Sequence, residues 1–231
     1  MADYINHLLF GIYPYIALAV LAIGSIVRFD REPYSWRASS SQLLRRKQLI
    51  WGSVLFHLGV LVVFFGHLVG LLVPIWVFES LHVKHEWKQV LAVVAGGIAG
   101  TFSFIGATML LHRRLFDARI RVNSTFADTG ILVLLWLQLA LGLMTIPVSL
   151  GHLDGKEMVK FMAWANGIFT FDQAASSYLV GSSPIFRVHI FLGLTIFLLF
   201  PFTRLVHMLS APVRYLWRPG YQVVRSRKLA S

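Results

Sequence analysis

The chain has 231 residues, of which 57% are hydrophobic and 13% are charged, whereas soluble domains carry roughly 25% charged residues. This composition argues against a soluble enzyme and against a nucleic-acid partner, even though the formal net charge is +11. The chain contains no cysteine. Disulfides, cysteine-ligated iron–sulfur clusters and thioether-linked haem are therefore excluded within it.

Five apolar stretches are long enough to cross a membrane as helices, which takes about 20 residues each. They cover about residues 4–27, 49–73, 88–111, 128–148 and 185–209, and a polar tail follows at 210–231. We therefore expect an all-α, polytopic membrane protein with a single domain over residues 1–231. Small residues let membrane helices approach closely, and the third stretch contains four that we expect to serve this purpose: Gly96, Gly97, Gly100 and Gly106.

Lysine and arginine are distributed unevenly among the connections. The connections at 28–48 and 112–127 hold six and four of them, and the tail holds five, whereas those at 74–87 and 149–184 hold one and two. Under the positive-inside rule, the basic connections and the tail lie in the cytoplasm. This places the N-terminus outside and the C-terminus in the cytoplasm, and it accounts for the positive charge without a nucleic acid.

Four histidines lie inside apolar stretches: His57 and His67 in the second, and His189 and His207 in the fifth. An ionisable ring in hydrocarbon is costly unless it is satisfied, so such residues are candidates for function. The alternative is a hydrogen bond to a neighbouring helix and nothing more. Because the second and fifth helices run antiparallel in this topology, we expect His57 to meet His207 on the cytoplasmic side. His67 then meets His189 on the outer side.

The spacing of the histidines differs between the two helices. At about 1.5 Å per residue, His57 and His67 are about 15 Å apart along the axis, and His189 and His207 are about 27 Å apart. On a straight helix, His189 and His207 also share one face. We expect helix tilt and a kink near Pro201 to absorb the mismatch.

Two histidines from opposed helices suit the two axial positions of haem iron, whereas a zinc site usually takes four ligands in a tetrahedron. The pattern therefore predicts two b-type haems within the bundle, one for each histidine pair. Glycines near the histidines are expected to leave space for the porphyrins: Gly59, Gly66, Gly70 and Gly193.

Over nearly its whole length, the sequence resembles the gamma subunit of respiratory nitrate reductase, a membrane cytochrome b. The resemblance rests on residues 12–17, 36–42, 56–57 with 66–67, 113–116, and 186–189 through 198–202 to 204–207. It implies that His57 and His207 hold the haem nearer the cytoplasm, and that His67 and His189 hold the outer one. It also suggests a quinol site at Lys88 with Gly66 nearby. The alternative for Lys88 is an ordinary anchor whose ammonium reaches the membrane surface.

The resemblance also implies a function for the whole chain. Quinol is oxidised near the outer face, its protons are released outside, and its electrons pass through the outer haem and then the cytoplasmic-side haem. They leave to an iron–sulfur beta subunit, and a molybdenum-containing alpha subunit reduces nitrate. Both partners lie on the cytoplasmic side of a bacterial or archaeal cytoplasmic (inner) membrane, and the remaining contacts are with membrane lipid.

Two other functions stay open on the sequence. The chain is alternatively the cytochrome b of another quinol-linked reductase, of the heterodisulfide or sulfite type. A haem-free membrane anchor or small transporter is the alternative from a different class, with the histidines as polar links between helices. Arg113, Arg114 and Arg204 either hold haem propionates or only set the topology. The basic tail between Arg218 and Lys228 either docks a partner or likewise sets the topology.

Overall fold

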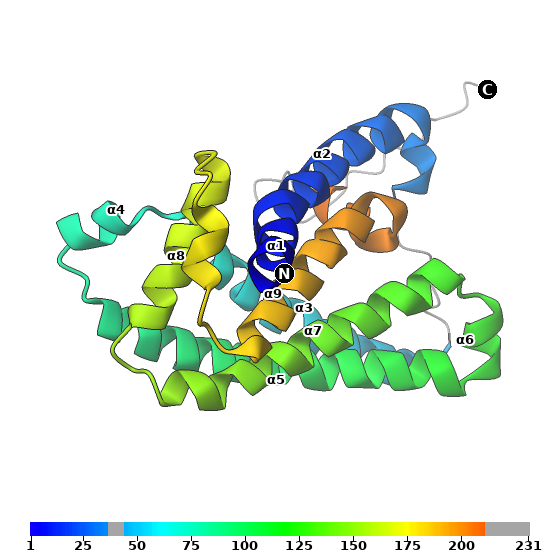
Figure 1. Cartoon of the computed structure of the whole chain (residues 1–231). Coiled ribbons are helices and arrows are strands. Elements are labelled where there is room, and N and C mark those ends of the chain that lie inside the picture. The colour runs from blue at the N-terminus through cyan, green and yellow to red at the C-terminus, as the bar shows by residue number, and fades with distance from the viewer. Residues whose placement is uncertain (37–43, 211–231) are drawn as a thin grey trace, which may run out of the picture.

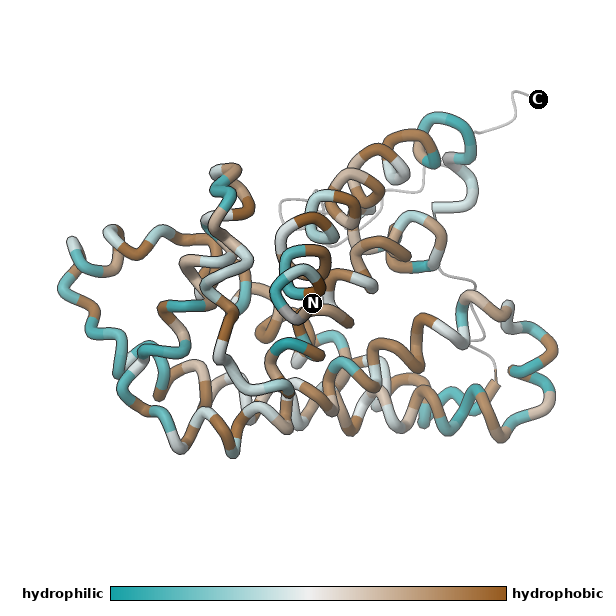
Figure 2. Tube along the Cα trace, viewed as in Figure 1, coloured by the Kyte–Doolittle hydropathy of each residue, from teal (hydrophilic) through white to brown (hydrophobic). Residues whose placement is uncertain are grey.

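The computed structural model describes residues 1–36 and 44–210, and this part of the chain is helical without any strand (Figure 1). Five of its helical segments are long and apolar enough to cross a membrane: Asp3–Arg31, Arg46–Leu72, His85–Phe116, Phe126–Leu150 and Pro184–Phe202. The predicted all-α membrane fold is therefore confirmed. Hydrophobic residues line these segments, and hydrophilic residues concentrate at their ends (Figure 2). The basic tail between Arg218 and Lys228 lies outside the described residues.

The bundle consists of five long helices: α2 (Tyr13–Arg31), α3 (Arg46–Leu72), α5 (His85–Phe116), α7 (Phe126–Leu150) and α9 (Pro184–Leu199). Shorter elements precede, connect or follow them: α1 (Ala2–His7), η1 (Leu8–Ile12), η2 (Pro33–Ser35), α4 (Ile75–Ser80), α6 (Ala118–Val122), α8 (Lys156–Phe169), η3 (Ala175–Leu179), η4 (Phe200–Phe202) and η5 (Arg204–Ser210). The elements α1, η1 and α2 follow one another without a break and form the first span.

The long helices pack in the order α3, α5, α7, α9 and α2, each against the next. Within the described part of the chain, α3 and α9, which carry three of the four candidate histidines, share no comparable helix–helix interface. The side chains of these two helices therefore meet without close approach of their backbones.

Glycines bring α5 close to its neighbours. A Cβ atom at Gly106 would lie 2.7 Å from the carbonyl oxygen of Gly52 on α3, and a Cβ at Gly100 would lie 3.1 Å from Leu143 on α7. Such contacts leave no room for a larger residue. The predicted packing role is confirmed for Gly97, Gly100 and Gly106, whereas a Cβ at Gly96 would meet nothing within 4 Å.

The first span is tied to α8 at its π-helical turn, η1, which comes just before Pro14. Because proline has no backbone N–H, the carbonyl of Phe10 lacks the donor that a regular helix would supply. The indole Nε1 of Trp164 on α8 donates to this carbonyl at 2.9 Å. On the other side of α8, the Asn166 amide donates to the carbonyl of Leu71 at the end of α3, also at 2.9 Å. The helix α8 therefore covers the end of the bundle where α3 stops.

The fifth span differs from the prediction of one helix over 185–209. The helix α9 ends at Leu199, and Thr203 is extended before the separate 3₁₀ segment η5 begins. Pro201 cannot continue the hydrogen-bond ladder, and its ring packs where a Cβ of Gly24 on α2 would lie, 2.8 Å away. Arg28 on α2 donates to the exposed carbonyls of Pro201 and Thr203 at 2.7 and 2.8 Å. The kink expected near Pro201 is thus a complete break that α2 stabilises.

Candidate functional site: two pairs of facing histidines

The structure brings the four intramembrane histidines together in the predicted pairs. The ring centroids of His57 and His207 lie 6.3 Å apart with an interplanar angle of 71°. Those of His67 and His189 lie 6.1 Å apart at 44°. The two pairs occupy different depths of the bundle, because His57 is nearer the start of α3 and His67 is nearer its end.

The break in the fifth span makes this pairing possible. Ten residues separate the two histidines of α3, whereas 18 separate His189 from His207. His189 belongs to α9, but His207 lies on η5, beyond the break. The expectation that these two share one face of a straight helix is therefore wrong. The chain changes direction between them, so the eight additional residues between His189 and His207 do not extend along a single helix axis.

The separation within each pair fits one metal ion held between two imidazoles. A bond from a first-row transition metal to an imidazole nitrogen is about 2.0 Å long, so two such bonds and half of each ring span about 6 Å between centroids. Within the described residues, no group of three or more histidine or carboxylate side chains could hold a metal ion. Each pair therefore offers two opposed ligands, the donor set of bis-histidine haem iron.

Three of the four rings are oriented by their own segment of chain. The Nδ1 atom of His57 lies 2.7 Å from the carbonyl oxygen of Ser53, and that of His67 lies 2.8 Å from the carbonyl of Val63. His207 makes the same kind of bond to the carbonyl of Arg204. Because a carbonyl only accepts, Nδ1 carries the proton in each ring, and Nε2 keeps the lone pair that binds a metal.

His189 is the exception. Its Nδ1 atom is buried and has no hydrogen-bond partner among the described residues. The neighbouring helix α7 contacts this ring instead: the amide nitrogen of Gln138 lies 3.4 Å from His189 Nε2 and donates to the His189 carbonyl at 3.1 Å. Sequence reasoning missed Gln138, although a glutamine in the middle of an apolar span was a visible signal.

The glycines near the histidines have different roles. A Cβ at Gly66 or Gly70 would meet no atom within 4 Å, so both keep an open surface beside α3. Gly59 does not, because its Cβ would lie 2.8 Å from the backbone nitrogen of Ser103 on α5. The prediction that Gly59 makes room for a porphyrin is therefore wrong, since it makes room for α5. Gly193 faces the amide of Gln138.

A shallow pocket lies beside His57. It has a volume of about 380 Å³ and is lined by Ser53, Val54, His57 and Leu58. The apolar lining, with one ring nitrogen available, suits the edge of a flat hydrophobic cofactor.

Lys88 at the start of α5 is buried, with only 8% of its surface exposed. Its ammonium lies 3.1 Å from the sulfur of Met162 on α8 and 3.3 Å from the centroid of the Phe78 ring. The reading as an anchor that reaches solvent does not fit this burial. The register of α3 on α5 sets Gly59 against Ser103 and so places Gly66 eight residues from Lys88, or about 12 Å along the axis. The structure does not bring Lys88 and Gly66 into contact.

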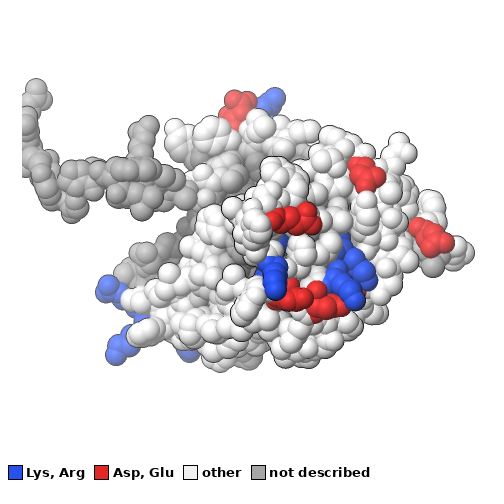
Figure 3. Space-filling model, turned by 90° about the vertical axis from the view of Figure 1, so that its left-hand side faces the viewer, with Lys and Arg blue, Asp and Glu red and all other residues white. Residues whose placement is uncertain are grey.

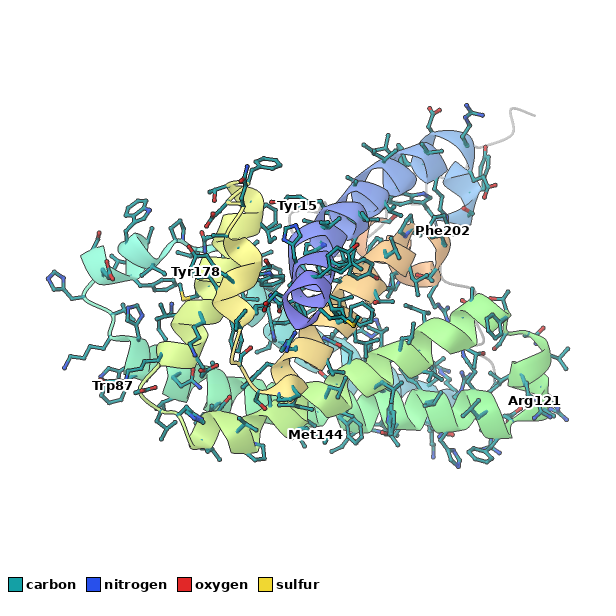
Figure 4. The ribbon with its side chains drawn as sticks, viewed as in Figure 1. Tyr15, Trp87, Arg121, Met144, Tyr178 and Phe202 are labelled. Carbon is teal, nitrogen blue, oxygen red and sulfur yellow. The ribbon has the colours of Figure 1, made fainter. Side chains whose placement is uncertain are left out.

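The two ends of the bundle differ in charge. Figure 3 faces the end that carries α4 and α8, where acidic and basic side chains both gather; the ion pairs Lys156–Asp154 and Lys160–Glu157 are 3.0 and 2.6 Å long. The opposite end, near α6, carries Arg113, Arg114, Arg119 and Arg121, and Figure 4 labels Arg121 there, far from Trp87.

The arginines considered as propionate ligands all lie at that α6 end. Arg204 at the start of η5 is 3.6 Å from Asp128 on α7, and Arg113 donates to the carbonyl of Leu44 at 2.6 Å. Arg114 has one buried guanidinium nitrogen, Nη1, that finds no partner among the described residues. Asp128 also completes the capping box of α7 with Thr125, so one carboxylate stabilises both the helix start and η5.

The fold and the paired histidines define a class: a polytopic helical membrane protein with two pairs of facing histidines at different depths of its bundle. The family model of the nitrate reductase gamma subunit matches residues 6–227. The chain is 51% identical to the respiratory nitrate reductase 1 gamma chain of Escherichia coli (strain K12), covering 97% of this chain and 99% of that one. It is 38% identical to the nitrate reductase gamma chain of Bacillus subtilis (strain 168), over 96% and 99% of the two chains. The chain belongs to the nitrate reductase gamma subunit family.

Proposed function

We propose that the chain is the diheme cytochrome b subunit of a membrane-bound respiratory nitrate reductase and that it oxidises quinol near the outer face. Membership of the family assigns it to an oxidoreductase complex with alpha and beta partner subunits. The observation that carries the diheme proposal is the centroid separation of 6.3 and 6.1 Å in the two histidine pairs. In this proposal, His57 and His207 hold the cytoplasmic-side haem b, and His67 and His189 hold the outer one.

When bound, the two haems would supply one-electron transfer between quinol on the outer side and an iron–sulfur beta subunit on the cytoplasmic side. The chain contributes the geometry for this chemistry. The backbone carbonyls of Ser53 and Val63 keep the proton of their histidine partners on Nδ1 and thereby leave Nε2 of each ring free to bind iron. His57 and His67 lie on an exposed, apolar face of α3, where a flat hydrophobic cofactor would cover them. By the same proposal, a molybdenum-containing alpha subunit reduces nitrate, and the complex resides in a bacterial or archaeal cytoplasmic membrane.

The charge difference between the ends supports the orientation of this proposal. The arginine-rich end near α6 carries the start of α3, close to His57, and the positive-inside rule places such an end in the cytoplasm. The mixed end with α4 and α8 then faces outside. The N-terminus is outside and the C-terminus cytoplasmic in this arrangement.

Lys88 is the proposed quinol-binding residue on the outer side. Among the described residues, its ammonium contacts only a thioether sulfur and an aromatic ring, which accept hydrogen bonds weakly. A quinol oxygen would be a stronger hydrogen-bond acceptor for this ammonium than either of its present contacts. The α3–α5 register places Lys88 about 10 Å beyond His67 along the axis, on the side away from His57. Gly66 leaves an open surface next to His67, and the ring of the quinol would pack against this surface.

The test of the diheme proposal is a reduced-minus-oxidised visible spectrum of the purified protein, combined with a pyridine haemochrome count. We expect two b haems for each chain. A complete, folded and colourless preparation would contradict the proposal and favour a haem-free anchor or transporter. If two haems are present, the subunits that co-purify distinguish a nitrate reductase from another quinol-linked reductase.

For the quinol site, the test is Lys88→Met, which keeps an unbranched chain of similar length in the buried position. We expect quinol oxidation to fall at least tenfold while both haems remain. Unchanged oxidation of quinol by Lys88→Met would leave Lys88 as a purely structural residue.

A further inference from the structure

His189 is held differently from the other three histidines of the two pairs. His57, His67 and His207 each place Nδ1 on a backbone carbonyl three or four residues earlier in their own segment. The Nδ1 of His189 is buried without such an acceptor among the described residues. Among the described residues, no hydrogen bond from Nδ1 to α9 therefore sets the rotation of this ring, and its polar contact comes from a neighbouring element.

That restraint lies on α7. The Gln138 amide nitrogen donates to the His189 carbonyl at 3.1 Å and lies 3.4 Å from His189 Nε2. The carbonyl acceptor decides which way the amide points, because only its NH₂ group can donate. The other end of the amide, Oε1, is buried and has no hydrogen-bond partner among the described residues. The side chain is therefore held by its N–H donors, and these are directed at His189.

Two glycines make this contact possible, one on each helix. A Cβ at Gly193, one turn after His189, would lie 3.2 Å from the Gln138 amide nitrogen. A Cβ at Gly142, one turn after Gln138, would lie 3.1 Å from Cε1 of His189. Each helix thus presents a polar side chain and, four residues later, a glycine that receives the polar side chain of the other helix. Both fits are tight enough that an added methyl group would displace its neighbour.

We propose that Gln138 is a positioning residue that fixes the ring of His189 and thereby tunes the haem held by His67 and His189. The proposal rests on the proposed function, since it assumes that this pair binds haem iron. The partial positive charge of the amide N–H group lies beside the ligand, where it favours the reduced, less positive state of the iron. Once Nε2 binds iron it has no lone pair left to accept a hydrogen bond, so the amide would act through its hydrogen bond to the His189 carbonyl and through its position beside the ring. Loss of the amide therefore lowers the midpoint potential of this haem and changes the angle between its two ligand rings.

The test is Gln138→Met, which keeps the length and volume of the side chain and removes its donors. The matched control is Gln48→Met. Gln48 donates to the carbonyl of Met109 on another helix at 3.1 Å and lies 3.3 Å from a ring nitrogen of His112. It is thus the same side chain in the same kind of contact, but beside a histidine outside both pairs. Redox titration followed by visible and electron paramagnetic resonance spectra resolves the two haems in each variant.

In Gln138→Met, we expect the equilibrium constant for reduction of the His67–His189 haem to fall about fivefold, which corresponds to about 40 mV for one electron. Its low-spin resonance signal should move as well, because that signal reports the angle between the ligand rings. The His57–His207 haem should keep its potential and signal. Gln48→Met should change neither haem. If Gln138 had a purely structural role, Gln138→Met would change the potentials and signals of both haems together, or it would only lower the melting temperature.

Gly193→Ala provides a second route, because it keeps the glutamine and displaces its amide from His189. We expect a shift of the same sign, confined to the same haem, and this variant decides the matter if Gln138→Met fails to assemble. The proposal would be overturned if the variant that assembles left both the potential and the resonance signal of the His67–His189 haem unchanged. It would also be overturned if neither variant assembled, since that would mark the contact as structural. Absence of haem from the wild-type protein is a separate result, because it would overturn the proposed function itself.

Discussion

The His67–His189 pair and the His57–His207 pair differ in what holds their second histidine. His189 lies on the regular helix α9, and its surroundings come from packing against α7. His207 lies on η5, beyond a break in the chain, where Arg28 satisfies the exposed carbonyls and Arg204 approaches Asp128. The comparison shows that a similar separation between two histidine rings can be reached by helix–helix fit or by polar contacts around a break. The two pairs should therefore respond to different mutations.

Removal of a single histidine tests whether the two sites are independent. We expect His67→Ala to lose only the haem of its own pair and His207→Ala to lose only the other, so that each variant retains one haem for each chain. The reason is that each iron would lose one of its two axial ligands while the other pair stays intact. A pyridine haemochrome count measures this. Loss of both haems in either variant would show that the pairs form one cooperative unit.

Arg28 should matter for the pair beyond the break and not for the other. Arg28→Ala leaves the carbonyls of Pro201 and Thr203 without their charged donor, and a hydrogen bond to a charged group contributes about 1.5–3 kcal/mol. We expect the His57–His207 haem to be bound at least tenfold more weakly, as measured by haem retention during detergent dilution. Arg31→Ala, on the exposed last turn of α2, is the control. Equal weakening of both haems by Arg28→Ala would contradict a local role.

Gly106 should affect both pairs, because it sets the position of α3, which carries one histidine of each. A Cβ at this position would lie 2.7 Å from the carbonyl oxygen of Gly52, and such overpacking costs about 1–3 kcal/mol. We expect Gly106→Ala to lower the melting temperature and to weaken the binding of both haems to a similar extent. Gly130→Ala, where a Cβ would meet nothing within 4 Å, should leave both unchanged. An effect confined to one haem would argue against α3 as their common support.

The smallest expected effect concerns Asp117, at the α6 end. Although partial desolvation raises its pKa, the backbone N–H groups of Ile120 and Arg119 and the guanidinium of Arg45, 2.8 Å away, outweigh this and hold the pKa of Asp117 below its usual value. A depressed carboxyl pKa contributes stability at neutral pH that is lost as the pH falls through the folded-state pKa. We therefore expect Asp117→Asn to lower the melting temperature slightly at pH 7. The difference from the wild type should vanish in acid, and a difference that persists there would have another cause.

Much of the architecture could be predicted because it depends on local properties. The five spans follow from runs of apolar residues, and their ends lie within five residues of those in the structure, except for the fifth. The pairing of His57 with His207 and of His67 with His189 also followed, because it needs only the antiparallel order of two helices. Neither step requires knowledge of which side chains touch.

The parts that failed depend on contacts between distant segments. Gly59 was expected beside a cofactor but packs against α5, because the direction of a glycine on a helix is decided by its partner helix. Gln138 was not recognised, because its contact with His189, which is 51 residues away in the chain, is visible only in the folded bundle. Lys88 was named as a candidate for the quinol site, which stays a prediction, but its burial beneath α8 and Phe78 could not be foreseen, since the connections follow no periodic pattern.

The sequence alone therefore determined the class of fold, the number of spans, the charge difference between the ends and the identity of the two histidine pairs. These depend on hydropathy, charge and order along the chain, which are properties of single residues and short stretches. Only the tertiary structure decided that the fifth span breaks at Pro201, that Arg28 on α2 satisfies the break, and that α7 holds His189. Each of these depends on which groups from separate helices come within hydrogen-bonding or van der Waals distance, and only the packed bundle sets those distances.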